Sequence, residues 1–182
     1  MSIKNLPFSP PSFTIKEEEA VLDCIKSRWI GTGPKTIEFE KKFAAFKEIQ
    51  YASALSSCTS ALFLSLKALG IKKGDEVITT AMTFCSSINV IIHCGAKPIL
   101  CDIDEYSKNI DVNKVESLIT SKTKAILPVH YAGYPCEMNK IQEIASKYEL
   151  YILEDCAHAI ESKFNYKHCG TFGDIGCFSF YA

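Results

Sequence analysis

Apolar and polar residues follow two different patterns along this chain, and the change comes near residue 50. Residues 1–13 contain three prolines and predict an irregular arm. After the arm, Thr14 and Glu17 have the spacing of a capping box, which opens a first helix. The apolar face of that helix consists of Ala20, Val21, Cys24 and Ile25. A second helix is indicated by the spacing of Phe39, Phe43 and Phe46.

From about residue 50 onward, short apolar runs alternate with helical stretches. The runs predict strands over residues 51–55, 76–80, 97–102, 124–130, 150–155 and 177–182. Helices are predicted between them over residues 59–69, 86–94, 111–119 and 138–148. Strands that are apolar throughout and alternate with helices are typical of a parallel sheet covered on both faces, so the sequence predicts an α/β fold. Ligands of such sheets bind at the carboxyl ends of the strands.

The composition narrows the classes of function. Twenty Lys and Arg residues against 21 Asp and Glu residues give a formal net charge of −1, which excludes a strongly basic nucleic-acid binder. Hydrophobic residues make up 47% of the chain, which is enough to bury a core. No apolar run reaches the roughly 18 residues that span a bilayer, and the first residues lack the apolar segment of a secretory signal. We therefore expect a cytoplasmic protein that has no membrane partner.

The nine cysteines form no C-x-x-C pair, although zinc sites commonly use such pairs. Most of them lie inside apolar stretches. We interpret them as small buried hydrophobic residues in a reducing compartment, and we expect no metal site.

Hydroxyl side chains gather where the first predicted strand ends and a helix begins. They belong to Ser56, Ser57, Thr59 and Ser60. The free N–H groups and the dipole of a helix N-terminus, together with these hydroxyls, suit a phosphate group. Ordinary helix capping explains the same residues, so both interpretations stay open here.

Other strand ends carry further candidate residues. Phe84 follows the second strand and would either stack on a flat ligand or belong to the core. His130 ends a buried strand, as a polar group of the crevice or as a structural histidine. Asp155 ends the apolar run of residues 150–153, where a carboxylate needs a cationic or donating partner unless it caps a turn. His158 follows three residues later, but no second cluster of ligands supports a metal site.

Taken together, these segments resemble one family, the DegT/DnrJ/StrS sugar aminotransferases, which are fold-type I enzymes that use pyridoxal phosphate (PLP). The matching segments, in order, are WIGTGPK, SSCTSAL, GDEVITTAMTF, TKAILPVHYAGYP, LYILEDCAHA and GTFGDIGCFSFYA. They extend from about residue 6 to the end of the chain. The HYAG segment is most similar to members that aminate UDP-linked 4-keto sugars, such as the 4-amino-4-deoxy-L-arabinose enzymes of lipid A modification.

The resemblance implies a role for six residues in binding PLP. Thr59 and Ser60 match positions that hold the cofactor phosphate, and Ser179 matches a second phosphate-binding hydroxyl. Phe84 matches the aromatic residue that stacks on the pyridine ring. Asp155 matches the aspartate that pairs with the pyridine nitrogen and keeps the ring protonated. His158 matches a histidine that lies against the ring region.

The resemblance also implies that parts of the family's fold lie outside these 182 residues. In the family, the Schiff-base lysine follows the FSF-x-A motif, and this position lies beyond Ala182. The family's large sheet has the order 3-2-4-5-6-7-1, in which strand 7 is antiparallel and is absent here, as is the small domain. We therefore expect a doubly wound, three-layer, mostly parallel fold that is incomplete. Residues 1–48 would form an arm and helices, and residues 49–182 a partial PLP-binding large domain.

These observations predict a nucleotide-sugar aminotransferase present as its front half, inactive alone, with an amino-acid donor such as glutamate. The full-length form is expected to be a homodimer. A non-catalytic remnant of a disrupted gene and a PLP-dependent sugar 3-dehydratase, in which histidine replaces the lysine, remain alternatives. A Rossmann-type module is disfavoured, because Gly170, Gly173 and Gly176 do not have the G-x-G-x-x-G spacing.

Overall fold

The computed structural model describes residues 11–181, so most of the predicted N-terminal arm and Ala182 lie outside the described residues. Two compact units divide the chain. The first comprises Met1–Ala54 with Phe180–Ala182, and the second comprises Leu55–Ser179. The predicted boundary after residue 48 stays a prediction.

The first unit contains the two predicted helices, α1 (Ile15–Ser27) and α2 (Pro34–Lys47). The capping box is confirmed, because the Glu17 carboxylate accepts a hydrogen bond from the Thr14 N–H at 2.6 Å. Nevertheless, no residue of α1 is buried, so its apolar face is not covered by the described residues. The predicted aromatic face of α2 packs on Phe180, whose ring meets Phe39 and Phe43 edge-on at 5.1 and 5.5 Å between centroids.

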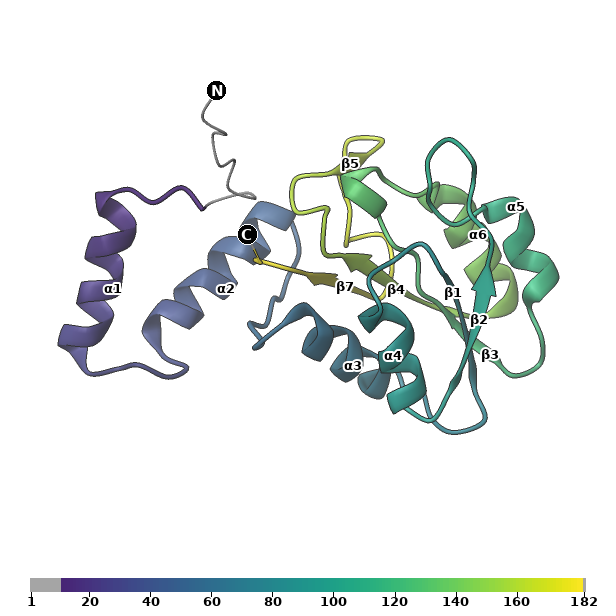
Figure 1. Ribbon diagram of the computed structural model, residues 1–182, viewed down its shortest axis with the longest axis horizontal. Helices are drawn as coiled ribbons and strands as arrows, with labels where there is room; N and C mark the ends of the chain where they lie inside the picture. Colours follow the sequence, from purple (N-terminus) through teal and green to yellow (C-terminus); the bar gives the residue numbers. More distant parts are fainter. Residues whose placement is uncertain (1–10, 182) are drawn as a thin grey trace, which may run out of the picture. The chain divides into compact units, whose positions relative to one another are not determined.

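The second unit is built on a five-stranded sheet with the order β2-β1-β3-β4-β7, shown in Figure 1. Its strands are β1 (Glu76–Thr80), β2 (Lys97–Cys101), β3 (Thr123–Ile126), β4 (Tyr151–Cys156) and β7 (Ile175–Phe178). All four pairings are parallel, which confirms the predicted α/β class. The order agrees with the part of the family sheet that the sequence was expected to contain. The sheet grows in one direction from β1 to β2 and in the other from β1 to β3, and ligand crevices open at such a reversal.

Residues 51–55 do not form a strand, which corrects the sequence prediction. The Ala54 N–H instead donates a hydrogen bond to the Glu40 carboxylate at 2.8 Å. A strand exists only through its ladder partner, and the neighbour that the resemblance gives to this segment is not among the 182 residues. The predicted strand over residues 124–130 is also shorter, since Pro128 has no N–H to donate to a ladder.

Helices cover both faces of the sheet, as expected for three layers. On one face, α3 (Cys58–Ala68) and α4 (Ser86–His93) pack on a core that includes Val77 and Leu153. On the other face, α5 (Val112–Val115), the short 3-10 helix η1 (Glu116–Leu118) and α6 (Met138–Tyr148) pack on a core that includes Ile78 and Ile152. Neighbouring residues of one strand therefore belong to opposite cores, because successive side chains of a strand point to opposite faces.

A glycine caps the end of α3. Gly70 has a φ of 78°, and its N–H and that of Ile71 donate to the carbonyls of Lys67 and Leu66. This is the Schellman arrangement, in which glycine takes the left-handed conformation without strain.

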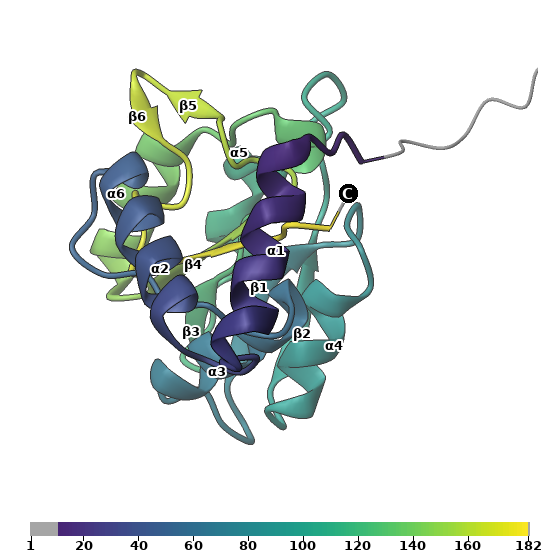
Figure 2. The ribbon, with the colours of Figure 1, turned by 90° about the vertical axis from the view of Figure 1, so that its left-hand side faces the viewer.

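A small antiparallel hairpin of β5 (Lys163–Phe164) and β6 (Lys167–His168) was not predicted. Its two turn residues, Asn165 and Tyr166, both have positive φ values, of 48° and 65°. Two consecutive positive φ values are the geometry of the turn that suits the twist of a tight hairpin. Figures 1 and 2 both show the hairpin on the side of the unit opposite to α3 and α4.

Six of the nine cysteines are buried and all nine are free thiols, in agreement with the predicted hydrophobic role. No helix among residues 11–181 is both long and apolar enough to cross a bilayer.

Candidate functional site

Asp155 is a buried carboxylate at the carboxyl end of β4, with an exposed fraction of 4%. Its Oδ2 accepts a hydrogen bond from the Ser87 hydroxyl at 2.7 Å, and its Oδ1 accepts one from the Ala157 N–H at 3.1 Å. A carboxylate offers about four acceptor positions, so two remain for a further donor. The sequence analysis inferred that this carboxylate needs a donor. Ser87 of α4 and the Ala157 N–H are two such donors.

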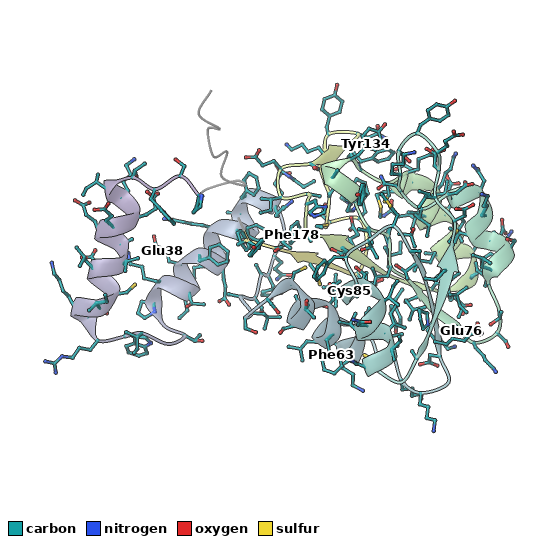
Figure 3. The ribbon with its side chains drawn as sticks, in the orientation of Figure 1. Glu38, Phe63, Glu76, Cys85, Tyr134 and Phe178 are labelled. Carbon is teal, nitrogen blue, oxygen red and sulfur yellow. The ribbon has the colours of Figure 1, made fainter. Side chains whose placement is uncertain are left out.

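Phe84 lies in the loop between β1 and α4, and 72% of its surface is exposed. Core packing, one of the two interpretations of this residue, is therefore excluded for the described residues. Its carbonyl accepts from the Ser87 N–H at 3.2 Å, which links the loop to the helix turn that meets Asp155. Cys85, labelled in Figure 3, follows Phe84 directly and is exposed as well.

The N-terminus of α3 carries the hydroxyl cluster. Ser57 is the N-cap, and its hydroxyl oxygen accepts from the Ser60 N–H at 3.1 Å. The Ser60 hydroxyl also lies 3.0 Å from that of Ser57 and 3.1 Å from that of Ser56. Helix capping is therefore real here, and it leaves Thr59 as the exposed hydroxyl of the first turn.

This helix end lies within electrostatic reach of Asp155. Burial raises the pKa of the Cys58 thiol to about 12, and the charge of Asp155 adds to the increase. Burial likewise raises the pKa of Cys177 to about 11, again with a contribution from Asp155. Cys58 begins α3 and Cys177 is paired with Asp155 across β7 and β4, so the hydroxyl cluster and the carboxylate belong to one region.

His158 is exposed and lies beside the loop that follows β3. Its Nδ1 accepts a hydrogen bond from the Ala132 N–H at 3.3 Å, so in the neutral ring the proton lies on Nε2. Ala132 belongs to a 3-10 turn, η2 (Tyr131–Gly133), and has a φ of 51°, which is unusual for a residue other than glycine. The neighbouring Gly133 also lacks room for a side chain, since a Cβ there would be 2.9 Å from the His158 carbonyl oxygen.

Ser179 is half-buried and lies one residue beyond β7. The structure therefore places Phe84, Asp155, His158 and Ser179 where β1, β4 and β7 end, and Thr59 and Ser60 at the start of the helix that packs on β7 and β4. All six lie in the unit of Leu55–Ser179.

His130 is a structural histidine, which decides between the two sequence interpretations. The residue is fully buried, and its Nε2 lies 3.0 Å from Oε2 of Glu154. Its Nδ1 accepts from the Cys136 N–H at 3.1 Å, so Nε2 carries the proton and donates to Glu154. Cys156 lies close to both, and the three side chains could in geometry hold a metal ion. However, both ring nitrogens of His130 are already engaged in hydrogen bonds, and the Glu154 carboxylate accepts four.

Ser87 and Glu154 are the important residues that the sequence interpretation missed. Ser87 comes from a helix 68 residues before Asp155, so nothing in the local sequence signals their contact. Glu154 stands beside Asp155 in the sequence, and a second acidic residue in an otherwise apolar strand was an available signal.

One surface hollow lies elsewhere, beside the loop after β2. It has a volume of about 470 Å³ and is lined by residues that include Asp104, Asn109, Tyr134 and Lys163. None of the six predicted cofactor residues lines it.

Comparison with known proteins places this chain in a family. Residues 11–182 match the model of the DegT/DnrJ/EryC1/StrS aminotransferase family. The spore coat polysaccharide biosynthesis protein SpsC of Bacillus subtilis is 48% identical over 177 residues, which cover 97% of this chain and 46% of SpsC. The GDP-perosamine synthase of Escherichia coli O157:H7 is 46% identical over 98% of this chain and 50% of that protein.

Solved structures give the same result. The PLP form of Spr1654 from Streptococcus pneumoniae superimposes with a TM-score of 0.94 at 37% identity, over 98% of this chain and 49% of that chain. A PMP form of the same protein matches equally well. The chain thus spans about half the length of the relatives and structures that it matches.

Proposed function

Because this chain belongs to the DegT/DnrJ/EryC1/StrS aminotransferase family of PLP-dependent enzymes, we propose that it supplies the cofactor-binding half of a nucleotide-sugar aminotransferase. The observation that carries the proposal is Asp155, a buried carboxylate at the carboxyl edge of the sheet. Two donors hold it, and two acceptor positions remain. An ionised carboxylate is costly to bury unless it is paired. A protonated ring nitrogen is the partner that would pair with it.

The described residues fit PLP, a planar ring that carries a phosphate. The exposed ring of Phe84 offers a stacking surface near Asp155. The first turn of α3 offers the exposed Thr59 hydroxyl and the partly exposed Ser60 at a helix N-terminus, where an anion is stabilised. Ser179 adds a hydroxyl at the end of the neighbouring strand.

Each residue would have a defined task. Asp155 would accept a hydrogen bond from the protonated ring nitrogen and keep the proton on the ring, because an ionised carboxylate stabilises the positive charge. His158 would present its Nε2–H near the ring, since Ala132 occupies its other nitrogen. When bound, the cofactor supplies an electron-accepting ring that stabilises negative charge on the substrate carbon.

The substrate we propose is a keto sugar linked to a nucleoside diphosphate, with glutamate as amino donor. The HYAG segment at residues 130–133 favours a UDP-linked 4-keto sugar, whereas a relative at 46% identity is named for GDP-perosamine. Assays with both nucleotides would distinguish them. The Schiff-base lysine is not among these 182 residues, so turnover is proposed for a protein that also contains it. A homodimer and a cytoplasmic location are further parts of the proposal.

The cofactor assignment is tested by titrating the chain with pyridoxamine 5′-phosphate, whose binding needs no lysine. Asp155→Asn is nearly isosteric, but it removes the charge and replaces one acceptor oxygen by an NH₂ group. We expect it to weaken binding by roughly 10- to 150-fold, since a hydrogen bond to a charged group contributes about 1.5–3 kcal/mol. The matched control is Asp102→Asn, another aspartate at the end of a strand, whose carboxylate is exposed and pairs with Lys114 at 2.9 Å.

The control variant should bind as the unaltered chain does. Equal binding by the Asp155→Asn variant, or the same loss in both variants, would refute the placement of the cofactor. The hydroxyls at the start of α3 would then be helix caps alone.

A further inference from the structure

Two hydroxyl groups form consecutive hydrogen bonds that lead to the Asp155 carboxylate. Ser87 lies in the first turn of α4 and is fully buried. Its Oγ is 2.7 Å from Oδ2 of Asp155. The Oγ1 of Thr83, in the loop before α4, is 2.7 Å from the same Ser87 oxygen. Thr83, Ser87 and Asp155 thus form a line of hydrogen bonds from the loop after β1 to the end of β4.

The direction of the hydrogen bonds in this line follows from counting protons. An ionised carboxylate only accepts, and a serine hydroxyl has a single proton to donate. Ser87 therefore donates to Asp155 at 2.7 Å, and its longer contact of 3.3 Å with the Phe84 carbonyl is secondary. Since the Ser87 proton is used in this way, Thr83 donates its own proton to Ser87.

The line fixes how Asp155 faces the crevice. Ser87 occupies one position on Oδ2, and the Ala157 N–H occupies one on Oδ1. Both carboxylate oxygens are thus held, so the side chain has one orientation in which the remaining acceptor positions are defined. Because the bond comes from a buried side chain, solvent water does not replace it readily.

We propose that Ser87 is a positioning residue for the cofactor, with Thr83 orienting its hydroxyl. Ser87 does not touch the ring in this arrangement; it holds the carboxylate that does. The inference rests on the proposed function, because it takes the ring nitrogen as the partner of Asp155. Without Ser87, the carboxylate loses a donor and its fixed orientation, so the protonated ring is held less well.

The test uses the 182-residue chain and pyridoxamine 5′-phosphate labelled with ¹⁵N in the ring. Two quantities are measured, the dissociation constant and the ¹⁵N chemical shift of the bound ring, which reports whether the nitrogen is protonated. Ser87→Ala removes the hydroxyl, and Ser87→Thr keeps it. Thr79→Val is the matched control, since the buried Thr79 hydroxyl donates to the Leu127 carbonyl at 2.9 Å and not to Asp155.

We expect Ser87→Ala to weaken binding about tenfold, as for one hydrogen bond to a charged group, and to move the ring signal toward the neutral form. Ser87→Thr should restore the signal, and Thr79→Val should leave it unchanged. Binding and ring signal unaltered in Ser87→Ala would overturn the inference. The same loss in Thr79→Val would overturn it too, because the effect would then be one of stability.

The Asp155→Asn variant separates this failure from that of the proposed function. If it changes the ring signal and Ser87→Ala does not, Asp155 meets the ring and Ser87 is not its positioning residue. If the unaltered chain binds no pyridoxamine phosphate, or Asp155→Asn leaves the signal unchanged, the proposed function fails and the inference fails with it.

Discussion

Replacing Glu154 by glutamine should destabilise the protein severely, although the two side chains have nearly the same shape. Glu154 is fully buried in β4, and its two oxygens accept four hydrogen bonds. Oε2 accepts from Nε2 of His130 at 3.0 Å and from the Gly170 N–H at 2.8 Å. Oε1 accepts from the N–H groups of Phe172 and Gly173 at 2.7 and 2.8 Å. The carboxylate thus ties the segment before β7 to β4.

The magnitude follows from the single oxygen of an amide. In Glu154→Gln, one of the two carboxylate oxygens becomes an NH₂ group, which faces two donors whichever way the amide turns. Each buried donor left without an acceptor costs about 1–3 kcal/mol, so we expect a loss of about 2–6 kcal/mol. His130 cannot relieve this by moving its proton, because its Nδ1 must accept from the Cys136 N–H. The loss is large against the roughly 5–15 kcal/mol by which domains are stable.

The assay is urea unfolding followed by circular dichroism, with Glu116→Gln as control. Glu116 is exposed and accepts from Lys147 and Tyr148, at 2.6 and 2.7 Å. The loss of the Glu116 charge should change the unfolding midpoint little, because exposed ion pairs contribute little to stability. A midpoint for Glu154→Gln no lower than that of the control would refute the reasoning.

The stability that Glu154 contributes should depend on pH. Burial raises the pKa of the Glu154 carboxyl, but hydrogen bonds from His130, Gly173 and Gly170 outweigh it and leave the pKa below its ordinary value. A carboxyl with a lowered pKa stabilises the fold above its unfolded pKa, about 4.3, and this stability is lost as the pH falls through the folded value. The unaltered chain should therefore lose more stability below pH 4 than Glu154→Gln does.

Three further predictions concern thiols and turnover. Burial raises the pKa of Cys58 to about 12 and those of Cys101 and Cys177 to about 11, whereas unfolded thiols ionise near 8.5. Stability should thus be fully present below pH 8.5 and fall as the pH rises toward 11; a constant urea midpoint would contradict this. An alkylating reagent at pH 8 should modify the exposed Cys85 before Cys58, as peptide mass spectrometry would show, and equal rates would exclude it. The 182 residues alone should give no amino sugar from glutamate and a nucleotide-linked keto sugar, because the Schiff-base lysine is not among them; product above a PLP-only control would disprove it.

The regular elements were readable from the sequence because their signals are local. The strand over residues 76–80 was predicted to the residue, since an apolar run between turn signals is long enough to define both ends. The capping box at the start of α1 was readable for the same reason. Residues 51–55 have the same apolar character, but a strand also requires a neighbour, and local sequence does not report one.

Only part of the candidate site could be predicted from the sequence, because some of its contacts join residues far apart in the chain. Asp155 could be chosen because it ends a predicted strand, and Phe84 because it follows one, where ligands of such sheets bind. The hydroxyl line from Thr83 through Ser87 depends on how α4 packs on the sheet, which brings together residues far apart in the chain. Sequence periodicity predicts that α4 packs on the sheet but not which of its residues meets which strand.

The adjacent acids Glu154 and Asp155 lie on opposite faces of β4 and have different roles, one structural and one that we assign to the cofactor. Consecutive side chains of β4 point to opposite faces, so Glu154 shares the face of Ile152 and Asp155 that of Leu153. On the first face, Glu154 meets His130 and three backbone donors, which leave it no free acceptor position. On the other, Asp155 accepts from Ser87 and from one N–H among the described residues, so two of its acceptor positions remain. The unequal number of donors, and not burial, which the two carboxylates share, therefore distinguishes the structural acid from the one we assign to the cofactor.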